Sequence, residues 1–298
     1  MNQGVFMQSL TFRLLEVFQS IVDHGSITAA SSALSLSQPT VSLQLKKLSG
    51  IVGMPLFEQT YGQLKMTEAG EAVYQCAQEV LGSQSRLESQ IHALKGVEIG
   101  TLKLAVVTTA KYVVPPILSP FCRQHPNIEV RFTVGNRADI IERMRHNRDD
   151  VYIFSQPPQD DNLICTPFLQ NKLVVIAPPD YDGPDNCDLK DLINHKFLLR
   201  EYGSGTRRAI QDYTDNKGLV FRNSMIIESN EAIRLAVTSG LGLAILSEHT
   251  LAHTPPDSVR ILNINDFPLV NHWQAVTVKH RQISLAAQAF QKALLNVE

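Results

Sequence analysis

The stretch GSITAASSALSLSQPTVSLQLKKL, residues 25–48, decides the fold of the N-terminal part of this 298-residue chain. Ser26 is a good N-cap for a short, alanine-rich helix over residues 27–34. A tight turn follows, and Ser37 can cap a second helix whose first turn contains Pro39, where a missing N–H does no harm. The stretch therefore predicts two helices joined by a tight turn.

The second of these helices has two different faces. Val41, Leu45 and Leu48 recur at helical spacing and form one buried stripe. The opposite face mixes amide, hydroxyl and lysine side chains, which suits contact with base edges and phosphates in the major groove of DNA. A helical module that packs without touching DNA is the alternative. The residues predicted to contact DNA are Ser26, Thr28, Ser37, Gln38, Pro39, Thr40, Ser42, Leu43, Gln44, Lys46, Lys47 and Lys65.

The flanking sequence completes a helix-turn-helix with a wing. Leu14, Phe18 and Ile21 mark an amphipathic helix before the quoted stretch. After it, two short segments flank a turn at Tyr61-Gly62 and lead into another helix near Thr67. We predict a DNA-binding domain over residues 1–66.

Small, capping and apolar residues run through this block in a fixed order: Phe18, Gly25-Ser26, Ala29-Ala30, Ala33-Leu34, Ser37-Gln38-Pro39, Val41-Ser42, Leu48, Gly53, Leu56-Phe57, Thr67 and Ala69-Gly70. In that order they resemble the LysR-type transcriptional regulators, and the resemblance extends over the full length. It implies an N-terminal all-α winged helix-turn-helix with a long linker helix. It also implies a C-terminal α/β effector domain of two Rossmann-like lobes, similar to periplasmic binding proteins.

The charge pattern departs from that family. The net charge is −2, and residues 1–70 carry four basic and four acidic side chains: Arg13, Lys46, Lys47, Lys65, and Glu16, Asp23, Glu58, Glu68. Leu43, Gln59 and Gly62-Gln63 stand where the family usually carries basic residues. Because phosphate neutralisation supplies much of protein–DNA affinity, we expect a shallow salt dependence and modest affinity at a single site. Binding would then depend on oligomerisation.

Residues 67–96 predict a long linker helix with a heptad seam. Its positions alternate by four and three: Val73, Ala77, Val80, Gln84, Leu87, Ile91 and Leu94. A dimerisation coil is the favoured interpretation, since an apolar stripe on a lone helix must be buried somewhere. Packing of this helix on its own wing domain is the alternative. A dimer predicts an inverted-repeat operator in double-stranded DNA.

Residues 97–298 predict an α/β effector domain. Apolar strands over 102–107, 128–134, 151–154, 173–177, 225–227, 243–246 and 273–278 alternate with helices over 117–123, 138–145, from about 206, 230–239 and 284–295. Apolar strands alternating with helices imply parallel sheets covered on both faces, here in two lobes. Lobe I is expected over about 97–166 and 269–298, and lobe II over about 167–268. The resemblance implies that the chain crosses between the lobes twice, near Thr166-Pro167 and Phe267-Pro268.

Polar segments follow several of these strands and open helices. Ligands of open α/β sheets bind at the carboxyl ends of strands, so these segments are expected to line a cleft for an anion. Arg207 supplies a fork for phosphate or carboxylate. Taken singly, each segment is better explained as a turn or a helix cap, and it is their shared position at the ends of successive strands that favours an anion-binding cleft. The predicted effector-binding residues are Thr108, Thr109, Lys111, Asn136, Phe154, Ser155, Gln156, Gly203, Ser204, Gly205, Thr206, Arg207, Ser229 and Asn230.

Four segments of the effector domain resemble in sequence the LysR-type regulators of carbon-fixation and inorganic-carbon uptake operons. They are residues 109–112, 150–158, 167–179 and 203–207. That resemblance implies a small phosphorylated or carboxylate metabolite as effector, with no other cofactor. Family analogy favours a homotetramer built from homodimers and leaves contact with RNA polymerase open. The sequence does not decide between activation and repression.

Other classes of protein find less support in the residues. The four cysteines, Cys76, Cys122, Cys165 and Cys187, have no metal-ligand spacing, although a redox-sensing regulator using Cys165 and Cys187 stays open. No catalytic residue is predicted, because Ser204 lacks a nucleophile elbow and the Asp160-Asp161 pair lies in a polar loop. An enzyme-like or solute-binding domain fused to a DNA-binding head is the remaining alternative. The N-terminus has no basic signal region and no run approaches a membrane span, so we expect a cytoplasmic protein.

Overall fold

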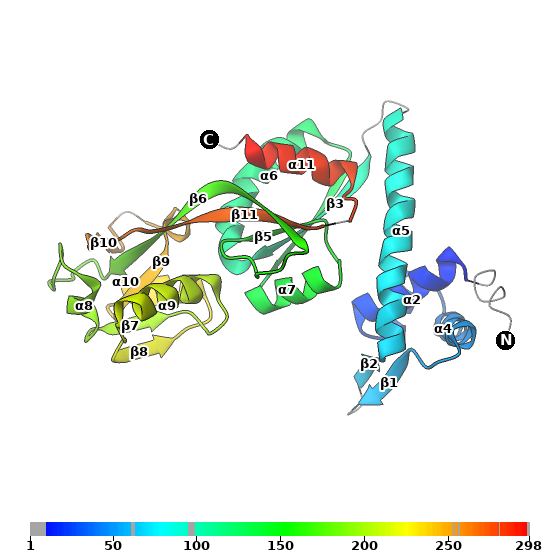
Figure 1. The fold of residues 1–298 in the computed structure, drawn as a ribbon, viewed down its shortest axis with the longest axis horizontal. Helices are drawn as coiled ribbons and strands as arrows, with labels where there is room; N and C mark the ends of the chain where they lie inside the picture. Colours follow the sequence, from blue (N-terminus) through cyan, green and yellow to red (C-terminus); the bar gives the residue numbers. More distant parts are fainter. Residues whose placement is uncertain are drawn as a thin grey trace. The chain divides into compact units, whose positions relative to one another are not determined.

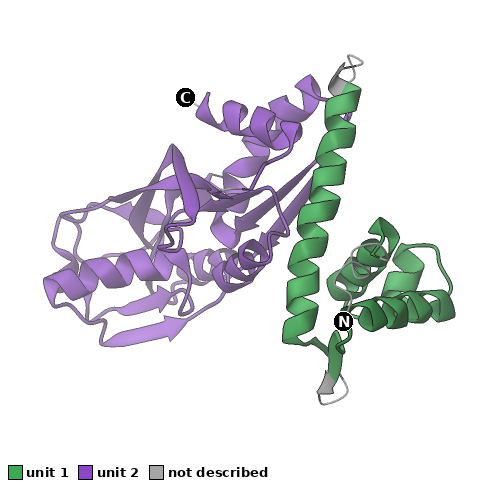
Figure 2. Cartoon of the chain, turned by 45° about the vertical axis from the view of Figure 1, so that its right-hand side comes forward, with its two compact units in different colours: residues 1–97 green, residues 98–298 purple. Residues whose placement is uncertain are grey.

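A computed structural model describes residues 10–60, 63–94, 99–252, 254–255, 257–279 and 281–296. The predicted wing turn at Tyr61-Gly62 lies outside these ranges. The chain divides into two compact units, residues 1–97 and 98–298 (Figure 2).

The first unit begins with the predicted helix-turn-helix and wing. Its elements are α2 (Phe12–His24), α3 (Ile27–Ala33), α4 (Gln38–Val52), β1 (Phe57–Thr60) and β2 (Gln63–Met66). The predicted caps are present: the hydroxyl of Ser26 accepts from the N–H of Ala29, and that of Ser37 accepts from the N–H of Thr40. Gly25 and Gly53 end α2 and α4 in the left-handed region, at φ 72° and 75°, which favours glycine.

Two small apolar clusters hold these helices together. Phe18 and Leu48 pack with Tyr74, while Val41 packs with Ile21 on the other side of α2. Every one of these side chains is fully buried. The core therefore fixes which face of α4 points outward.

Helix α5 (Glu68–Leu94) changes role along its length. Near its start, the hydroxyl of Tyr74 donates to Asp23 at 2.6 Å, and a Cβ at Gly70 would collide with the carbonyl oxygen of Leu56. Further along, Leu87 and Ile91 are 56% and 42% exposed. The first turns thus pack on the unit's own core, and later positions of the heptad seam remain available for a partner.

The second unit is built on one long sheet. Over the described residues, nine strands pair in the order β4-β3-β5-β11-β6-β9-β7-β8, with β10 beside β6. Its strands are β3 (Gly100–Val107), β4 (Ile128–Gly135), β5 (Val151–Phe154), β6 (Leu163–Ala177), β7 (Lys196–Leu199), β8 (Asn223–Ile226), β9 (Leu243–Ser247), β10 (Arg260–Leu262) and β11 (Leu269–Val278). Its helices are η1 (Thr108–Tyr112), α6 (Val114–Gln124), α7 (Arg137–Arg145), α8 (Leu189–Leu192), α9 (Gly205–Lys217), α10 (Asn230–Thr238), η2 (Glu248–Leu251) and α11 (Leu285–Leu295).

Two long antiparallel strands connect the lobes, in addition to the parallel strands that the sequence predicted. β6 and β11 pair along their length from Leu163 with Val278 to Leu173 with Leu269, and they run through both lobes (Figure 1). The parallel pairs β3–β4, β3–β5, β7–β8 and β7–β9 lie on either side. Thr166-Pro167, where the chain was expected to cross between the lobes, lies inside β6, and Phe267-Pro268 directly precedes β11.

The parallel strands are apolar on both faces because helices cover both. In lobe I, Val151 and Ile153 pack towards α6 and α11, while Tyr152 and Phe154 pack towards α7. In lobe II, Phe197 and Leu199 of β7 face one cluster and Leu198 faces the other. This alternation explains why the predicted strands were continuous apolar runs.

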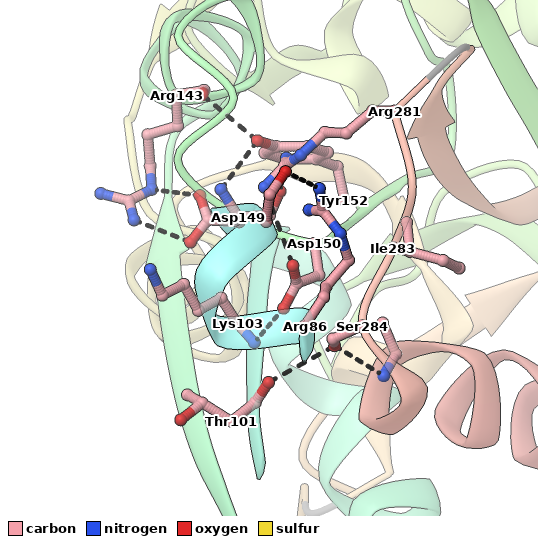
Figure 3. Close-up of polar contacts among 12 residues, drawn as sticks. Arg86, Thr101, Lys103, Arg143, Asp149, Asp150, Tyr152, Arg281, Ile283 and Ser284 are labelled. Carbon is pink, nitrogen blue, oxygen red and sulfur yellow. Dashed lines mark hydrogen bonds and ion pairs between the residues drawn. The ribbon is translucent and has the colours of Figure 1, made fainter. Parts of the chain in front are cut away.

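A polar network closes one end of lobe I (Figure 3). Arg143 donates two bonds of 2.8 Å to the buried carboxylate of Asp149, and the hydroxyl of Tyr152 donates to the carbonyl oxygen of Arg143. Asp150 accepts from the N–H of Lys103, and burial raises the pKa of its carboxyl group. These contacts satisfy charges at the start of β5, so we assign them to folding.

Within the described ranges, no helix is long and apolar enough to cross a membrane. The same residues contain no grouping of three or more His, Cys, Asp or Glu side chains fit to hold a metal ion.

Candidate DNA-binding face and effector cleft

The outward face of α4 carries most of the residues predicted to contact DNA. Gln38, Pro39, Ser42, Lys46 and Lys47 are exposed. Leu43 is 66% exposed, which is notable for a leucine and consistent with contact to a thymine methyl group. Gln44 and Thr40 are half-buried at the margins of this face, and Lys65 is exposed on β2.

Two of the predicted DNA contacts have a local structural role. The hydroxyls of Ser26 and Ser37 cap α3 and α4, and the Ser37 hydroxyl also lies 2.8 Å from that of Thr40. Among the described residues, the side chains of Gln38, Lys46 and Lys47 have no protein partner. These donors are free for bases and phosphates.

The predicted effector segments meet between the two lobes. Thr109 lies in η1 after β3, Ser155 follows β5, and Asn230 begins α10 in lobe II. The amide nitrogen of Asn230 donates to the hydroxyl of Thr109 at 2.9 Å. A Cβ at Gly205, the first residue of α9, would lie 3.2 Å from the hydroxyl oxygen of Ser155. The three polar side chains are more than nine-tenths buried.

Thr109, Asn230, Arg200 and Glu201 form a continuous chain of hydrogen bonds, which we call the interlobe relay. Arg200 donates to the amide oxygen of Asn230 at 2.6 Å and makes two bonds, of 2.7 and 2.8 Å, to Glu201. Arg200 is only 3% exposed, so this arrangement holds a buried charge with its counter-charge.

A second set of interlobe contacts surrounds Glu231, and we call it the Glu231 cluster. The carboxylate lies 2.5 Å from the ammonium of Lys111 and accepts from the hydroxyls of Tyr112 and Ser229. Burial opposes ionisation of Glu231, but the bonds from Lys111 and Tyr112 outweigh it and lower its pKa to about 2. Burial, followed by the bond to Glu231, raises the pKa of Tyr112.

Other predicted effector residues have visible structural roles. The hydroxyl of Thr108 donates to the carbonyl oxygen of Gly135, and Asn136 forms a capping box with Asp139 at the start of α7. Phe154 is fully buried in the lobe I core. The hydroxyl of Ser229 caps α10. These contacts place the four residues without indicating a ligand.

The loop before α9 is the remaining predicted segment. Gly203 has φ +91°, which a residue with a side chain rarely adopts, while Ser204 and Thr206 are buried. The guanidinium of Arg207 lies 5.1 Å from the centre of the Tyr202 ring. One of its nitrogens, Nη1, is buried without a hydrogen-bond partner in the part of the chain that the structure describes.

Sequence reasoning did not single out Tyr112, Arg137 or Arg208. Arg137 opens α7 and donates through Nε to the carbonyl oxygen of Gln156, and Arg208 lies in the first turn of α9. Their only signal in the sequence is position, because each directly follows a predicted site residue: Tyr112 follows Lys111, Arg137 follows Asn136 and Arg208 follows Arg207.

The cysteines give little support to a redox switch. All four are free thiols. Burial raises the pKa of Cys165 and of Cys187, so each has less reactive thiolate at neutral pH than an ordinary cysteine.

Two family models together match almost the whole chain. Residues 12–71 match the bacterial regulatory helix-turn-helix protein of the lysR family, and residues 95–297 match the LysR substrate binding domain. The chain belongs to the LysR family of transcriptional regulators. It is therefore a DNA-binding regulator and not an enzyme.

Proteins similar to this LysR regulator include a transcriptional activator and a regulator of a RuBisCO operon. It is 39% identical to the HTH-type transcriptional activator CmpR of Synechocystis sp., over 95% of this chain and 94% of the relative. It is 36% identical to the RuBisCO operon transcriptional regulator of Acidithiobacillus ferrooxidans, over 95% and 93% of the two chains. These relatives agree with the subgroup resemblance found in the effector domain.

Solved structures support the fold of both units. The regulatory domain of CcmR from Synechocystis, in complex with 2-PG, is 38% identical and covers 65% of this chain and 95% of its own, with a TM-score of 0.61. Full-length CbnR complexed with its target DNA has a TM-score of 0.66 at 21% identity, over 96% of this chain and 99% of its own.

Proposed function

We propose that a small anionic metabolite, bound between lobes I and II, controls how this LysR regulator binds DNA. One observation carries the proposal: Asn230 contacts Thr109, and Ser155 lies against the start of α9, so polar groups of both lobes lie together. Buried polar groups at strand ends form ligand sites in this fold class. The 2-PG complex of the related CcmR domain supports an anion as ligand.

The ligand would act by shifting a conformational equilibrium. The interlobe relay and the Glu231 cluster both connect lobe I to lobe II, so a ligand between the lobes changes how tightly they close. A coupling of about 1–3 kcal/mol would change DNA affinity or bending several-fold.

The regulator is proposed to act as a homodimer on an inverted-repeat operator. Leu87 and Ile91 expose a stripe on the second half of α5 that a second copy of this helix would bury. Two copies would present two α4 helices to two half-sites. By analogy with its relatives, the target genes serve carbon acquisition.

A thermal-shift panel of phosphorylated and carboxylate metabolites tests the effector. A ligand present at about 100 times its Kd should stabilise the protein by about 2.7 kcal/mol. The shift should disappear in Arg207→Ala and persist in Arg222→Ala, a matched control with an exposed arginine on lobe II. A footprint on operator DNA, taken with and without the stabilising metabolite, should change. No shift with any anion would refute the proposed effector class.

A further inference from the structure

Lobe I contains a cavity that is separate from the contacts between the lobes. The cavity has a volume of about 300 Å³ and lies between helix α11 and the paired strands β6 and β11 (Figure 1). Protein interiors contain few voids larger than a water molecule, whereas pockets for small ligands begin at about this size. The cavity, which we call the α11 pocket, is therefore large enough to hold a small organic molecule.

The wall of the α11 pocket is mostly apolar. Ile164 and Phe168 of β6, Ala275 of β11 and Leu294 of α11 all line it. Ala275 and Leu294 also belong to the buried core of lobe I, so this part of the wall is held rigidly. A ligand that buries apolar surface against these side chains would be stabilised by the hydrophobic effect.

One polar group in the wall is buried without a partner. Thr277 of β11 lines the pocket and is 5% exposed, and its hydroxyl makes no hydrogen bond with any described residue. Thr277 and Ala275 lie two positions apart, so their side chains share the face of β11 that α11 covers. A buried hydroxyl is costly unless it is hydrogen-bonded. A ligand with one hydrogen-bonding group would satisfy it.

The cation that lines the pocket is already neutralised. Nη1 of Arg281 donates to the carbonyl oxygen of Asp149, and Nη2 lies 3.7 Å from the carboxylate of Asp150 (Figure 3). The carboxylate of Asp149 is in turn bound by Arg143. An anionic ligand would have to compete with Asp150 for Arg281. The pocket therefore suits an uncharged molecule.

Phe168 connects the pocket to the junction between the lobes. Leu169 pairs with Trp273, and the next pair along the two strands is Pro167 with Gln274. Phe168 thus stands opposite no residue and forms a bulge in β6. On one side of the bulge, β11 pairs with β5 of lobe I, and on the other side β6 pairs with β9 of lobe II. Because a bulge bends and twists its strand, the position of Phe168 affects the angle between the lobes.

We infer that the α11 pocket is a second ligand site, for a small uncharged molecule with an apolar body and one hydroxyl or carbonyl group. The polar group bonds to the hydroxyl of Thr277, and the apolar body packs against Phe168. An occupied pocket then favours one angle between the lobes over others. The inference is independent of the anionic effector proposed above, because none of the residues predicted to bind that effector lines this pocket.

Calorimetric titration of the full chain with benzyl alcohol, toluene and benzoate tests the ligand class. The three probes share an apolar ring and differ in carrying a hydroxyl group, no polar group or a negative charge. We expect benzyl alcohol to bind with a Kd of about 1 mM or below, and benzoate to bind more weakly. Thr277→Val should weaken binding of benzyl alcohol by up to about tenfold and leave toluene unchanged, since it removes one neutral hydrogen bond. Thr133→Val, at a half-buried threonine of β4, is the matched control.

A variant that fills the pocket tests its location. Ala275→Val adds two methyl groups to the wall and should weaken binding of benzyl alcohol and toluene at least tenfold. Its melting curve without probe shows whether it folds, and Thr277→Val, which keeps the shape of the side chain, tests the same site if it does not.

Trp273 measures the effect on the bulge. This single tryptophan stands at the shift of register beside Phe168. Benzyl alcohol should change its fluorescence emission over the same concentration range as the calorimetric binding curve, and Ala275→Val should remove that change.

Each part of the inference has its own contrary result. If no probe binds saturably, or if a folded Ala275→Val binds benzyl alcohol as tightly as the wild type, the site is overturned and the anionic effector is unaffected. If benzoate binds more tightly than benzyl alcohol, or Thr277→Val binds both neutral probes unchanged, the ligand class is wrong. If binding leaves the emission of Trp273 unchanged, the link to the lobe angle is wrong.

Discussion

Replacement of Asn230 by alanine should destabilise the second unit by about 3 kcal/mol. Asn230 is 1% exposed, and its amide joins Thr109 of lobe I to Arg200 of lobe II. The variant leaves a buried guanidinium N–H without its acceptor, a loss of about 1.5–3 kcal/mol for a bond to a charged group, and removes a neutral bond worth about 1 kcal/mol. At about 2–4 °C per kcal/mol for a unit of this size, the melting temperature should fall by about 6–12 °C.

Tryptophan fluorescence measures this unit selectively. Trp273 is the single tryptophan of the chain and lies fully buried in β11. Asn162→Ala removes an exposed asparagine whose side chain makes no hydrogen bond in the described chain, and it should leave the melting temperature unchanged. Thr109→Val should cost about 1 kcal/mol alone and almost nothing in the Asn230→Ala background. An Asn230→Ala protein as stable as Asn162→Ala would refute the idea that the interlobe relay holds the lobes together.

Three further changes test other parts of the molecule. The pKa of Glu231 is lowered to about 2, so its contribution to stability is complete above the ordinary glutamate pKa of about 4.3 and is lost as the pH falls towards 2. Between these pH values, the melting temperature of Glu231→Gln should therefore depend less on pH than that of the wild type. An unchanged pH dependence would contradict the assignment. In Lys46→Gln, the slope of the logarithm of the DNA-binding constant against the logarithm of the salt concentration should fall in magnitude by about 1. Lys292→Gln, at an exposed lysine on α11, should leave the slope unchanged. Equal slopes in the two variants would show that Lys46 does not contact phosphate. Leu87→Lys should weaken dimerisation about a hundredfold or more, as measured by sedimentation velocity. Each dimer would lose the burial of two leucine side chains, and burial of each contributes at least about 1.5 kcal/mol. An undisturbed dimer would place the interface elsewhere.

The local features of the fold were predictable from the sequence. Ser26 and Ser37 cap the expected helices, and the stripe of Val41 and Leu48 is buried as its spacing requires. Such features depend on neighbours within a few positions. The strand over residues 151–154 was found at its observed bounds because it is apolar on both faces.

Features that depend on distant partners were missed. The first half of β6 contains only exposed and half-buried residues and includes Pro167, so it does not resemble the fully buried parallel strands. It is ordered by β11, in which Val278 pairs with Leu163 more than a hundred positions earlier. The hydrogen bond between Asn230 and Thr109 likewise joins two segments from different lobes, and no local pattern in the sequence indicates it.

The shared strands also have a consequence for the order in which the polypeptide can fold during synthesis. The core of lobe I joins Leu102 and Ile153 to Trp273 and Phe290, whereas the helices and parallel strands of lobe II lie between them in the chain. A ribosome must therefore produce all of lobe II before lobe I can bury its apolar surface. Until β11 and α11 have been synthesised, the apolar faces of the parallel strands β3 and β5 would remain exposed. We expect this interval to be the period when the nascent regulator most depends on chaperones.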